Sequence, residues 1–330
     1  MTPAQPSGPF RLAEEALHTA DMKSLEAVIC STPTVLEERA CDGDTLLGLA
    51  CRVATGNVAL PPERGTIEQH AAVDRILTAG ADPTAARTDG WAPLHTAAMT
   101  GHIDLAQRLL EAGAAREGRL LGCDGGSPLA LALFYAQTDV ARVLAAPPIP
   151  DSLRTAAALG HDLWRFVDGD VLTSDALVGL DFYRPLPVFP EWRRTYERQE
   201  VLDEALTWAA RNSQCESMSN LTALGANVNA NAYRGTALLW AVYSDSAVAA
   251  NWLLDHGADP NLKHDFGGDG HGVAAVALHL GAQFGAISCL KLLLERGADP
   301  TIVDGVHGAT PLDWARHGQS AEAIDLLQST

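Results

Sequence analysis

Residues 264–273 (HDFGGDGHGV) form a short glycine-rich stretch that carries side chains suited to chemistry. Two histidines and two aspartates lie within eight residues of one another, namely His264, Asp265, Asp269 and His271. Imidazole and carboxylate groups can bind transition metals, and a histidine oriented by an aspartate can act as a general base. Their spacing matches no known metal signature, so we expect neither a metal nor another cofactor. A plain surface loop is the alternative to a catalytic or ligand-polarising role.

Two nearby segments could supply further groups to the same site. Residues 304–308 occupy the equivalent position one repeat after residues 264–273. Residues 229–234, which include Tyr233 and Arg234, occupy the equivalent position one repeat before them. If the chain were an enzyme, its acid–base groups would be His271, His307, Asp265 and Asp269.

Residues 168–199 have an unusual composition for this chain. Five aromatic residues fall within fifteen positions: Phe182, Tyr183, Phe189, Trp192 and Tyr196. Four arginines accompany them, namely Arg184, Arg193, Arg194 and Arg198. Aromatic and arginine side chains are enriched in binding hot spots, and a guanidinium pairs with carboxylates or phosphates. The segment predicts a partner-binding loop, with simple cover of an exposed part of the fold as the alternative.

Several motifs with known chemistry are absent from the sequence. It contains no Gly-x-x-x-x-Gly-Lys-Ser/Thr phosphate loop, no Gly-x-Ser-x-Gly elbow and no His-Glu-x-x-His. Because no catalytic template is complete, the sequence favours a binding module over an enzyme.

The elements that must position these segments repeat along the chain. The tetrapeptide Gly-Ala-Asp-Pro begins at Gly80, Gly257 and Gly297, each time after an apolar helical run. The step from Gly80 to Gly113 is 33 residues, and the step from Gly257 to Gly297 is 40, which is one period plus an insertion. Such a period predicts a solenoid in which each repeat contacts its neighbours and an extended binding surface remains.

Residues 89–114 show the repeat most clearly. The tight turn Asp89-Gly90 precedes a helix that Pro93 can begin. The apolar face of this helix consists of Leu94, Ala97 and Ala98. Glycines at positions 101 and 113 end this helix and the one after it.

This pattern resembles the ankyrin repeat, with Pro-Leu-His-x-Ala-Ala, Gly-His and Gly-Ala segments in order and Ala92 in place of the usual threonine. Weaker copies begin near Asp124, Arg234, Leu278 and Gly308. The chain also bears a general resemblance to bacterial multi-ankyrin proteins. The ankyrin resemblance implies paired antiparallel helices, β-hairpin fingers and a concave face made of fingers and first helices. We therefore expect an all-α repeat solenoid of about eight or nine ankyrin units.

Departures from the repeat divide the chain into segments. We expect capping helices in 1–41, followed by repeats in 42–167 with an insertion between helices near 53–70. The aromatic and arginine-rich insertion follows at 168–199. Further repeats with a C-terminal cap occupy 200–330, including a long finger at 264–273.

The chain of 330 residues is acidic, with a formal net charge of −18. This charge argues against nucleic acid and membrane surfaces as partners, because both favour a basic footprint, and it suits a basic protein or peptide. Six scattered cysteines predict reduced, buried thiols. Neither a signal peptide nor an apolar run of membrane-spanning length is apparent, so we expect a cytoplasmic protein. The resemblance to bacterial multi-ankyrin proteins implies a bacterial setting.

We expect the concave groove and the 168–199 insertion to bind a protein or peptide. The alternative is a small-molecule binder or unusual enzyme with a pocket under that insertion and the fingers at 264–273 and 304–308, in which histidine and aspartate would perform acid–base chemistry. The residues expected to contact the partner or ligand are Tyr183, Arg184, Trp192, Arg193, Tyr233, Arg234, Trp240, Tyr243, His264 and His279. For His279, as for His95, hydrogen bonding within and between turns is the structural alternative, because both occupy the histidine position of the repeat.

Overall fold

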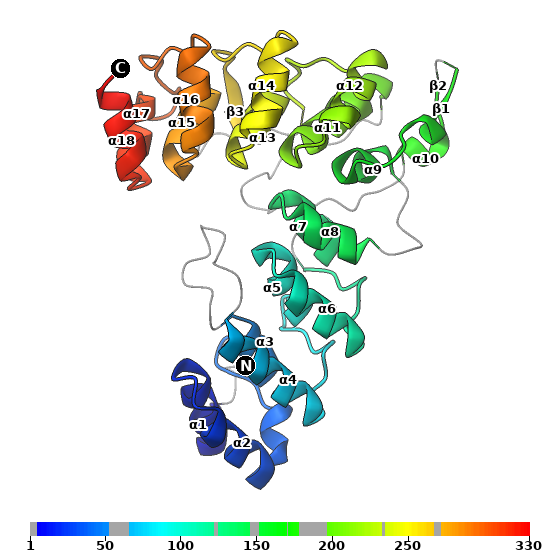
Figure 1. The fold of residues 1–330 in the computed structure, drawn as a ribbon, viewed down its shortest axis with the longest axis vertical. Coiled ribbons are helices and arrows are strands. Elements are labelled where there is room, and N and C mark those ends of the chain that lie inside the picture. The colour runs from blue at the N-terminus through cyan, green and yellow to red at the C-terminus, as the bar shows by residue number, and fades with distance from the viewer. Residues whose placement is uncertain are drawn as a thin grey trace. The chain divides into compact units, whose positions relative to one another are not determined.

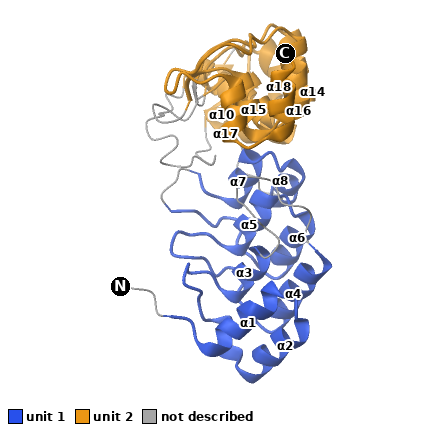
Figure 2. Ribbon diagram, turned by 90° about the vertical axis from the view of Figure 1, so that its left-hand side faces the viewer, with its two compact units in different colours: residues 1–148, 181–183 blue, residues 149–180, 184–330 orange. Residues whose placement is uncertain are grey.

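The computed structural model describes residues 5–52, 66–121, 125–145, 152–169, 171–177, 197–232, 235–266 and 272–330. The chain divides into two compact units, shown in different colours in Figure 2. The described residues up to Ala145 belong to unit 1, and those from Ser152 onward belong to unit 2. Among the helices of these described ranges, none is long and apolar enough to cross a membrane.

Unit 1 is built from helix pairs, and the first helix of each pair packs on the first helix of the next (Figure 1). The pairs are α1 (Gly8–His18) with α2 (Met22–Ser31), α3 (Leu46–Arg52) with α4 (Ile67–Thr78), α5 (Pro93–Thr100) with α6 (Ile103–Glu111), and α7 (Pro128–Phe134) with α8 (Thr138–Leu144). The 3-10 turn η1 (Pro33–Leu36) follows α2.

The sequence of the third pair explains how a repeat is formed. Pro93 occupies the first turn of α5, and Leu94, Ala97 and Ala98 are completely buried on its apolar face. Gly90, in the turn before α5, has a φ of 85°, and a Cβ there would lie 2.3 Å from the carbonyl oxygen of Arg119. Glycine is therefore required both by the backbone conformation and by the close approach of the next turn.

Unit 2 continues the same arrangement with five first helices, each packed on the next. They are α9 (Leu153–Leu159), α11 (Arg198–Arg211), α13 (Ala237–Tyr243), α15 (Ala277–Phe284) and α17 (Pro311–His317). The last four are followed by the second helices α12 (Cys215–Ala223), α14 (Ala247–Asp255), α16 (Ile287–Glu295) and α18 (Ala321–Gln328).

The segment after α9 differs from the other pairs. It forms the 3-10 turn η2 (Trp164–Phe166), the antiparallel strands β1 (Val167–Asp168) and β2 (Val171–Leu172), and the short helix α10 (Ser174–Leu177). The first ten residues of the insertion expected at 168–199 therefore contain short regular elements, and α11 begins inside its last two residues.

A longer finger joins α14 to α15. Strands β3 (His264–Phe266) and β4 (Gly272–Ala275) pair in antiparallel register, with Phe266 opposite Gly272 and an irregularity between His264 and Asp265. The next finger is attached to this one, because the N–H of Gly305 donates to the carbonyl oxygen of Val273 at 2.6 Å.

The expected helical repeat architecture is confirmed, whereas two details differ from expectation. Residues 67–70 belong to α4 and not to the insertion predicted near 53–70, because the side chain of Thr66 accepts from the N–H of Gln69 and caps a helix there. The expectation of buried cysteines is wrong for Cys30 and Cys41, which are exposed, although the five described cysteines are all free thiols.

Candidate functional site

Many of the residues singled out from the sequence lie outside the described part of the chain. They are Tyr183, Arg184, Trp192, Arg193, Tyr233, Arg234, Asp269 and His271. Asp265 lies on β3. The structure therefore places side chains for Trp240, Tyr243, His264, His279 and His307, all in unit 2.

Three successive first helices of unit 2 end on side chains that touch one another. The helices α11, α13 and α15 end at Arg211, Tyr243 and Phe284, which we call the helix-end row. The guanidinium carbon of Arg211 lies 4.5 Å from the centre of the Tyr243 ring. The rings of Tyr243 and Phe284 meet edge to face with centroids 5.0 Å apart. Tyrosine is frequent in binding hot spots, and aromatic side chains are enriched in protein interfaces, so this row is a candidate contact surface.

Exposure divides these residues into contacting and supporting positions. Tyr243 and Phe284 are partly exposed, whereas Arg211 is 2% exposed and Trp240 is 1% exposed. Trp240 packs edge to face against Tyr243 at 5.7 Å. Trp240 therefore holds Tyr243 in position but does not itself offer a surface to a partner.

His279 is completely buried at the start of α15. Its Nδ1 accepts from the N–H of Val276 at 3.2 Å, and its Nε2 lies 3.1 Å from the carbonyl oxygen of Ala309 in the next finger. Burial lowers the pKa of His279, and its hydrogen bonds with Ala309 and Val276 only partly oppose this effect. A neutral ring with its proton on Nε2 satisfies both contacts. His279 thus makes the bonds of the structural alternative, and we do not retain it as a contact residue.

His264 and His307 lie in different surroundings. His264 is 4% exposed on β3, whereas His307 is exposed. The N–H of His307 donates to Oδ1 of Asp304 at 2.6 Å, and Nε1 of Trp314 donates to Oδ2 of the same carboxylate at 2.8 Å. Asp304 thus joins the finger to α17. Its bond to His307 is made by the backbone N–H of that residue, so this bond does not orient the imidazole ring as a base.

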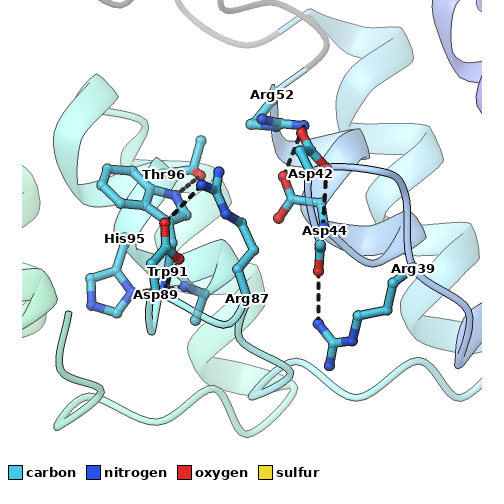
Figure 3. Close-up of polar contacts among 11 residues, drawn as sticks. Arg39, Asp42, Asp44, Arg52, Arg87, Asp89, Trp91, His95 and Thr96 are labelled. Carbon is cyan, nitrogen blue, oxygen red and sulfur yellow. Dashed lines mark hydrogen bonds and ion pairs between the residues drawn. The ribbon is translucent and has the colours of Figure 1, made fainter. Parts of the chain in front are cut away.

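A second polar cluster lies in the first two fingers of unit 1 (Figure 3). Nη2 of Arg52, the last residue of α3, lies 2.6 Å from Oδ2 of Asp42 and 2.8 Å from Oδ2 of Asp44. The side chain of Asp44 is only 5% exposed, whereas that of Asp42 is 43% exposed. One guanidinium therefore bridges a buried and an exposed carboxylate.

The pKa values of the two carboxylates are shifted in opposite directions. Burial raises the pKa of Asp44, and the nearby Arg52 charge only partly opposes this effect. Burial also acts to raise the pKa of Asp42, but hydrogen bonds from Arg52 and from the N–H of Asp44 outweigh it and hold that pKa below its ordinary value. Asp42 thus remains an exposed anion at neutral pH.

The same cluster connects neighbouring fingers. Nη1 of Arg39 donates to the carbonyl oxygens of Gly43 at 3.0 Å and Ala86 at 2.7 Å, which lie in successive fingers. In the second finger, Nη2 of Arg87 donates to Asp89 at 2.7 Å. Sequence reasoning missed this cluster, although an Asp-Gly turn with an arginine a few residues away occurs in both fingers and was the available signal.

The described side chains are suited to recognition through charge and aromatic contacts. Across the described ranges, no group of three or more His, Cys, Asp or Glu side chains is arranged to hold a metal ion. The carboxylates of the unit 1 cluster are engaged with arginines, and the helix-end row contains no general base.

Comparison with known proteins identifies the repeats. The family described as "Ankyrin repeats (3 copies)" matches residues 66–151 and 194–264, and that described as "Ankyrin repeat" matches residues 276–305. Together these matches cover more than half of the chain. They do not support the enzyme alternative.

Similar curated proteins match over shorter regions. The chain is 31% identical to mitochondrial disaggregase from Bos taurus over 39% of this chain and 23% of that protein. It is 37% identical to ankyrin repeat and SOCS box protein 16 from Mus musculus over 30% of this chain and 21% of that protein. It is 42% identical to protein PhlB from Serratia liquefaciens over 23% of this chain and 31% of that protein. The chain thus spans less than a third of the length of each of these relatives. The family matches and the helix pairs of both units show that this chain belongs to the ankyrin-repeat family, whose repeats are generally protein-interaction modules.

Proposed function

We propose that this chain binds a protein or peptide partner, and that the helix-end row of unit 2 forms part of the contact surface. The observation that carries the proposal is the contact between Tyr243 and Phe284, two partly exposed rings on neighbouring first helices. Exposed aromatic rings held rigidly by a buried neighbour lose little conformational freedom on binding, so they contribute more of their contact energy.

The fingers of unit 2 support the proposal because they are held firmly in place. The side-chain amide of Asn229 donates to the carbonyl oxygen of Gly257 at 2.9 Å, and its oxygen accepts from the N–H of Asp259 at 2.9 Å. Asn261 repeats this arrangement toward Gly297 and Asp299. Each turn therefore fixes the next, and a surface ordered before binding avoids part of the entropic cost of association.

The insertion at 168–199 remains part of this proposal. Its candidate contacts Tyr183, Arg184, Trp192 and Arg193 combine the two side-chain types that dominate hot spots. The formal charge of −18 favours a basic partner. A bacterial, cytoplasmic setting is likewise retained as a proposal. The resemblance to bacterial multi-ankyrin proteins supports the bacterial part, and the scattered cysteines support the cytoplasmic part.

The proposal is tested with the full chain as bait. A protein captured from cells is purified, and its dissociation constant is measured for the wild type, for the double variant Tyr243→Ala/Phe284→Ala and for the control Val248→Ser. Val248 is 69% exposed on the second helix α14 of the same unit.

Loss of both rings is expected to weaken binding by about 2–4 kcal/mol, and the control is expected to bind as the wild type does. Rising salt should weaken binding to a basic partner. Equal affinities for the folded double variant and the wild type would exclude the helix-end row as a contact surface.

A further inference from the structure

A buried ion pair joins α9 and α11, the first two of the five packed first helices of unit 2. Nε of Arg154, near the start of α9, donates to Oε2 of Glu204 in the middle of α11. The side chain of Arg154 is 3% exposed, and that of Glu204 is completely buried. Removing two charges from water is unfavourable unless their remaining hydrogen-bonding groups are also satisfied.

Arg154 does not meet that condition within the described part of the chain. Both of its terminal nitrogen atoms, Nη1 and Nη2, are buried and have no hydrogen-bond partner among the described residues. A guanidinium offers five N–H donors and cannot lose its charge by deprotonation. Nη1 and Nη2 of Arg154 can therefore donate hydrogen bonds to an additional acceptor.

We propose that Nη1 and Nη2 of Arg154 form a binding site for a carboxylate ligand. Glu204 occupies Nε, which leaves the end of the guanidinium where two parallel N–H groups match the two oxygens of a second carboxylate. The Arg154–Glu204 pair is already formally neutral. A carboxylate consequently adds one buried negative charge, whereas a phosphate dianion would add two.

The position of a second arginine favours an anionic ligand at this site. Arg211 follows Glu204 by seven residues on α11, so the two side chains leave the helix on the same face about 10 Å apart. The guanidinium of Arg211 is buried against the Trp240 and Tyr243 rings. Its charge adds a positive potential on the face of α11 to which Glu204 also belongs. A free carboxylate in solution suffices for this site, so the inference does not depend on the protein-binding function proposed above.

The test uses sodium acetate as the probe and the full chain at pH 7. Saturation transfer from the protein to the acetate methyl group and the thermal unfolding midpoint are both measured, with sodium chloride and sodium phosphate as comparison salts at equal ionic strength. We expect saturation transfer to acetate and a midpoint that rises more with acetate than with either comparison salt. The variant Arg154→Lys, which replaces the fork by a single ammonium group, should weaken acetate binding about tenfold.

Two further variants make the result specific. Arg142→Lys alters a half-exposed arginine on α8 and should leave acetate binding unchanged. Glu204→Gln removes the carboxylate that competes for Arg154 and should strengthen it. The proposal is overturned if the wild type shows no acetate-specific effect, if phosphate has the larger effect, or if Arg154→Lys binds acetate as the wild type does. The wild-type comparison of the three salts decides the matter even if Arg154→Lys and Glu204→Gln fail to fold.

Discussion

The guanidinium carbon of Arg211 lies 4.3 Å from the centre of the Trp240 ring. This contact joins the end of α11 to the middle of α13, and both side chains are almost fully buried. A desolvated cation over an indole face contributes about 2 kcal/mol. The pair is therefore one of the contacts that link these two neighbouring repeats of unit 2, and it includes Arg211 of the helix-end row.

Replacing Trp240 tests this link. Trp240→Ala removes the ring and leaves a cavity, so it should lower the free energy of unfolding by about 3–5 kcal/mol. Trp240→Phe keeps an aromatic face under Arg211 and should cost clearly less. Trp164→Ala, at a side chain that is 52% exposed, is the control and should change stability by less than about 0.5 kcal/mol. Urea denaturation measures all three, and equal losses for the two Trp240 variants would contradict the role given to the ring face.

The two buried histidines of the repeat predict a pH dependence of stability. Burial lowers the pKa of both His95 and His279 in the folded chain. A group whose pKa falls on folding stabilises the fold above its ordinary pKa, about 6.5 for histidine, and loses that contribution as the pH falls. The wild type should therefore lose stability from pH 7 to pH 5.

A double variant, His95→Gln/His279→Gln, should be less stable than the wild type at pH 7 but should show a shallower decline toward pH 5. Urea midpoints measured at half-unit steps of pH give the slope. His18→Gln/His317→Gln, at two exposed positions, serves as the matched control and should keep the wild-type slope. An unchanged slope in the buried double variant would show that other groups cause the decline.

The repeat residues could be predicted from the sequence because each obeys a local rule. Pro93 begins α5, and Gly90 adopts the positive φ that its turn requires. His279 occupies a position that its neighbours fix, and its two hydrogen bonds follow from that position. These features depend on residues that are close in sequence or one period away, which a repeating pattern reveals.

The candidate contact residues were harder to predict because they depend on exposure. Trp240 and Tyr243 are close in sequence and similar in type, yet one is buried and the other is partly exposed. That difference arises from packing between α11, α13 and α15, which a single repeat does not encode. The ion pair between Arg154 and Glu204 spans fifty residues, and no local pattern indicated that an arginine near the start of α9 would be buried.

Asp42 and Asp44 should respond to pH in opposite ways, although both contact Arg52. Because burial raises the pKa of Asp44, this residue stabilises the fold below the ordinary aspartate pKa of about 3.9 and loses that contribution as the pH rises through its higher folded-state pKa. Asp44→Asn should therefore gain stability relative to the wild type as the pH rises from 4 to 7.

Asp42→Asn is the matched comparison. Its folded-state pKa is lowered, so Asp42 stabilises the fold above the ordinary value and loses that contribution as the pH falls. Relative to the wild type, Asp42→Asn should lose stability over the same rise from pH 4 to pH 7. Thermal midpoints at each pH check both trends, and two variants that change in parallel would refute the separate environments assigned to these carboxylates.

The insertion at 168–199 gives the prediction that bears most directly on partner binding. Trp192→Ala/Arg193→Ala removes an adjacent aromatic and arginine pair, and if these side chains are hot spots the affinity for the captured partner should fall by about 2–4 kcal/mol. The chain offers a matched control in Trp164→Ala/Arg165→Ala, since Trp164 and Arg165 are also adjacent and both are exposed. Affinities of purified, folded variants measured by calorimetry would distinguish the two pairs. Full binding by the Trp192 and Arg193 variant, or an equal loss in the control, would mean that the insertion does not contribute a specific contact.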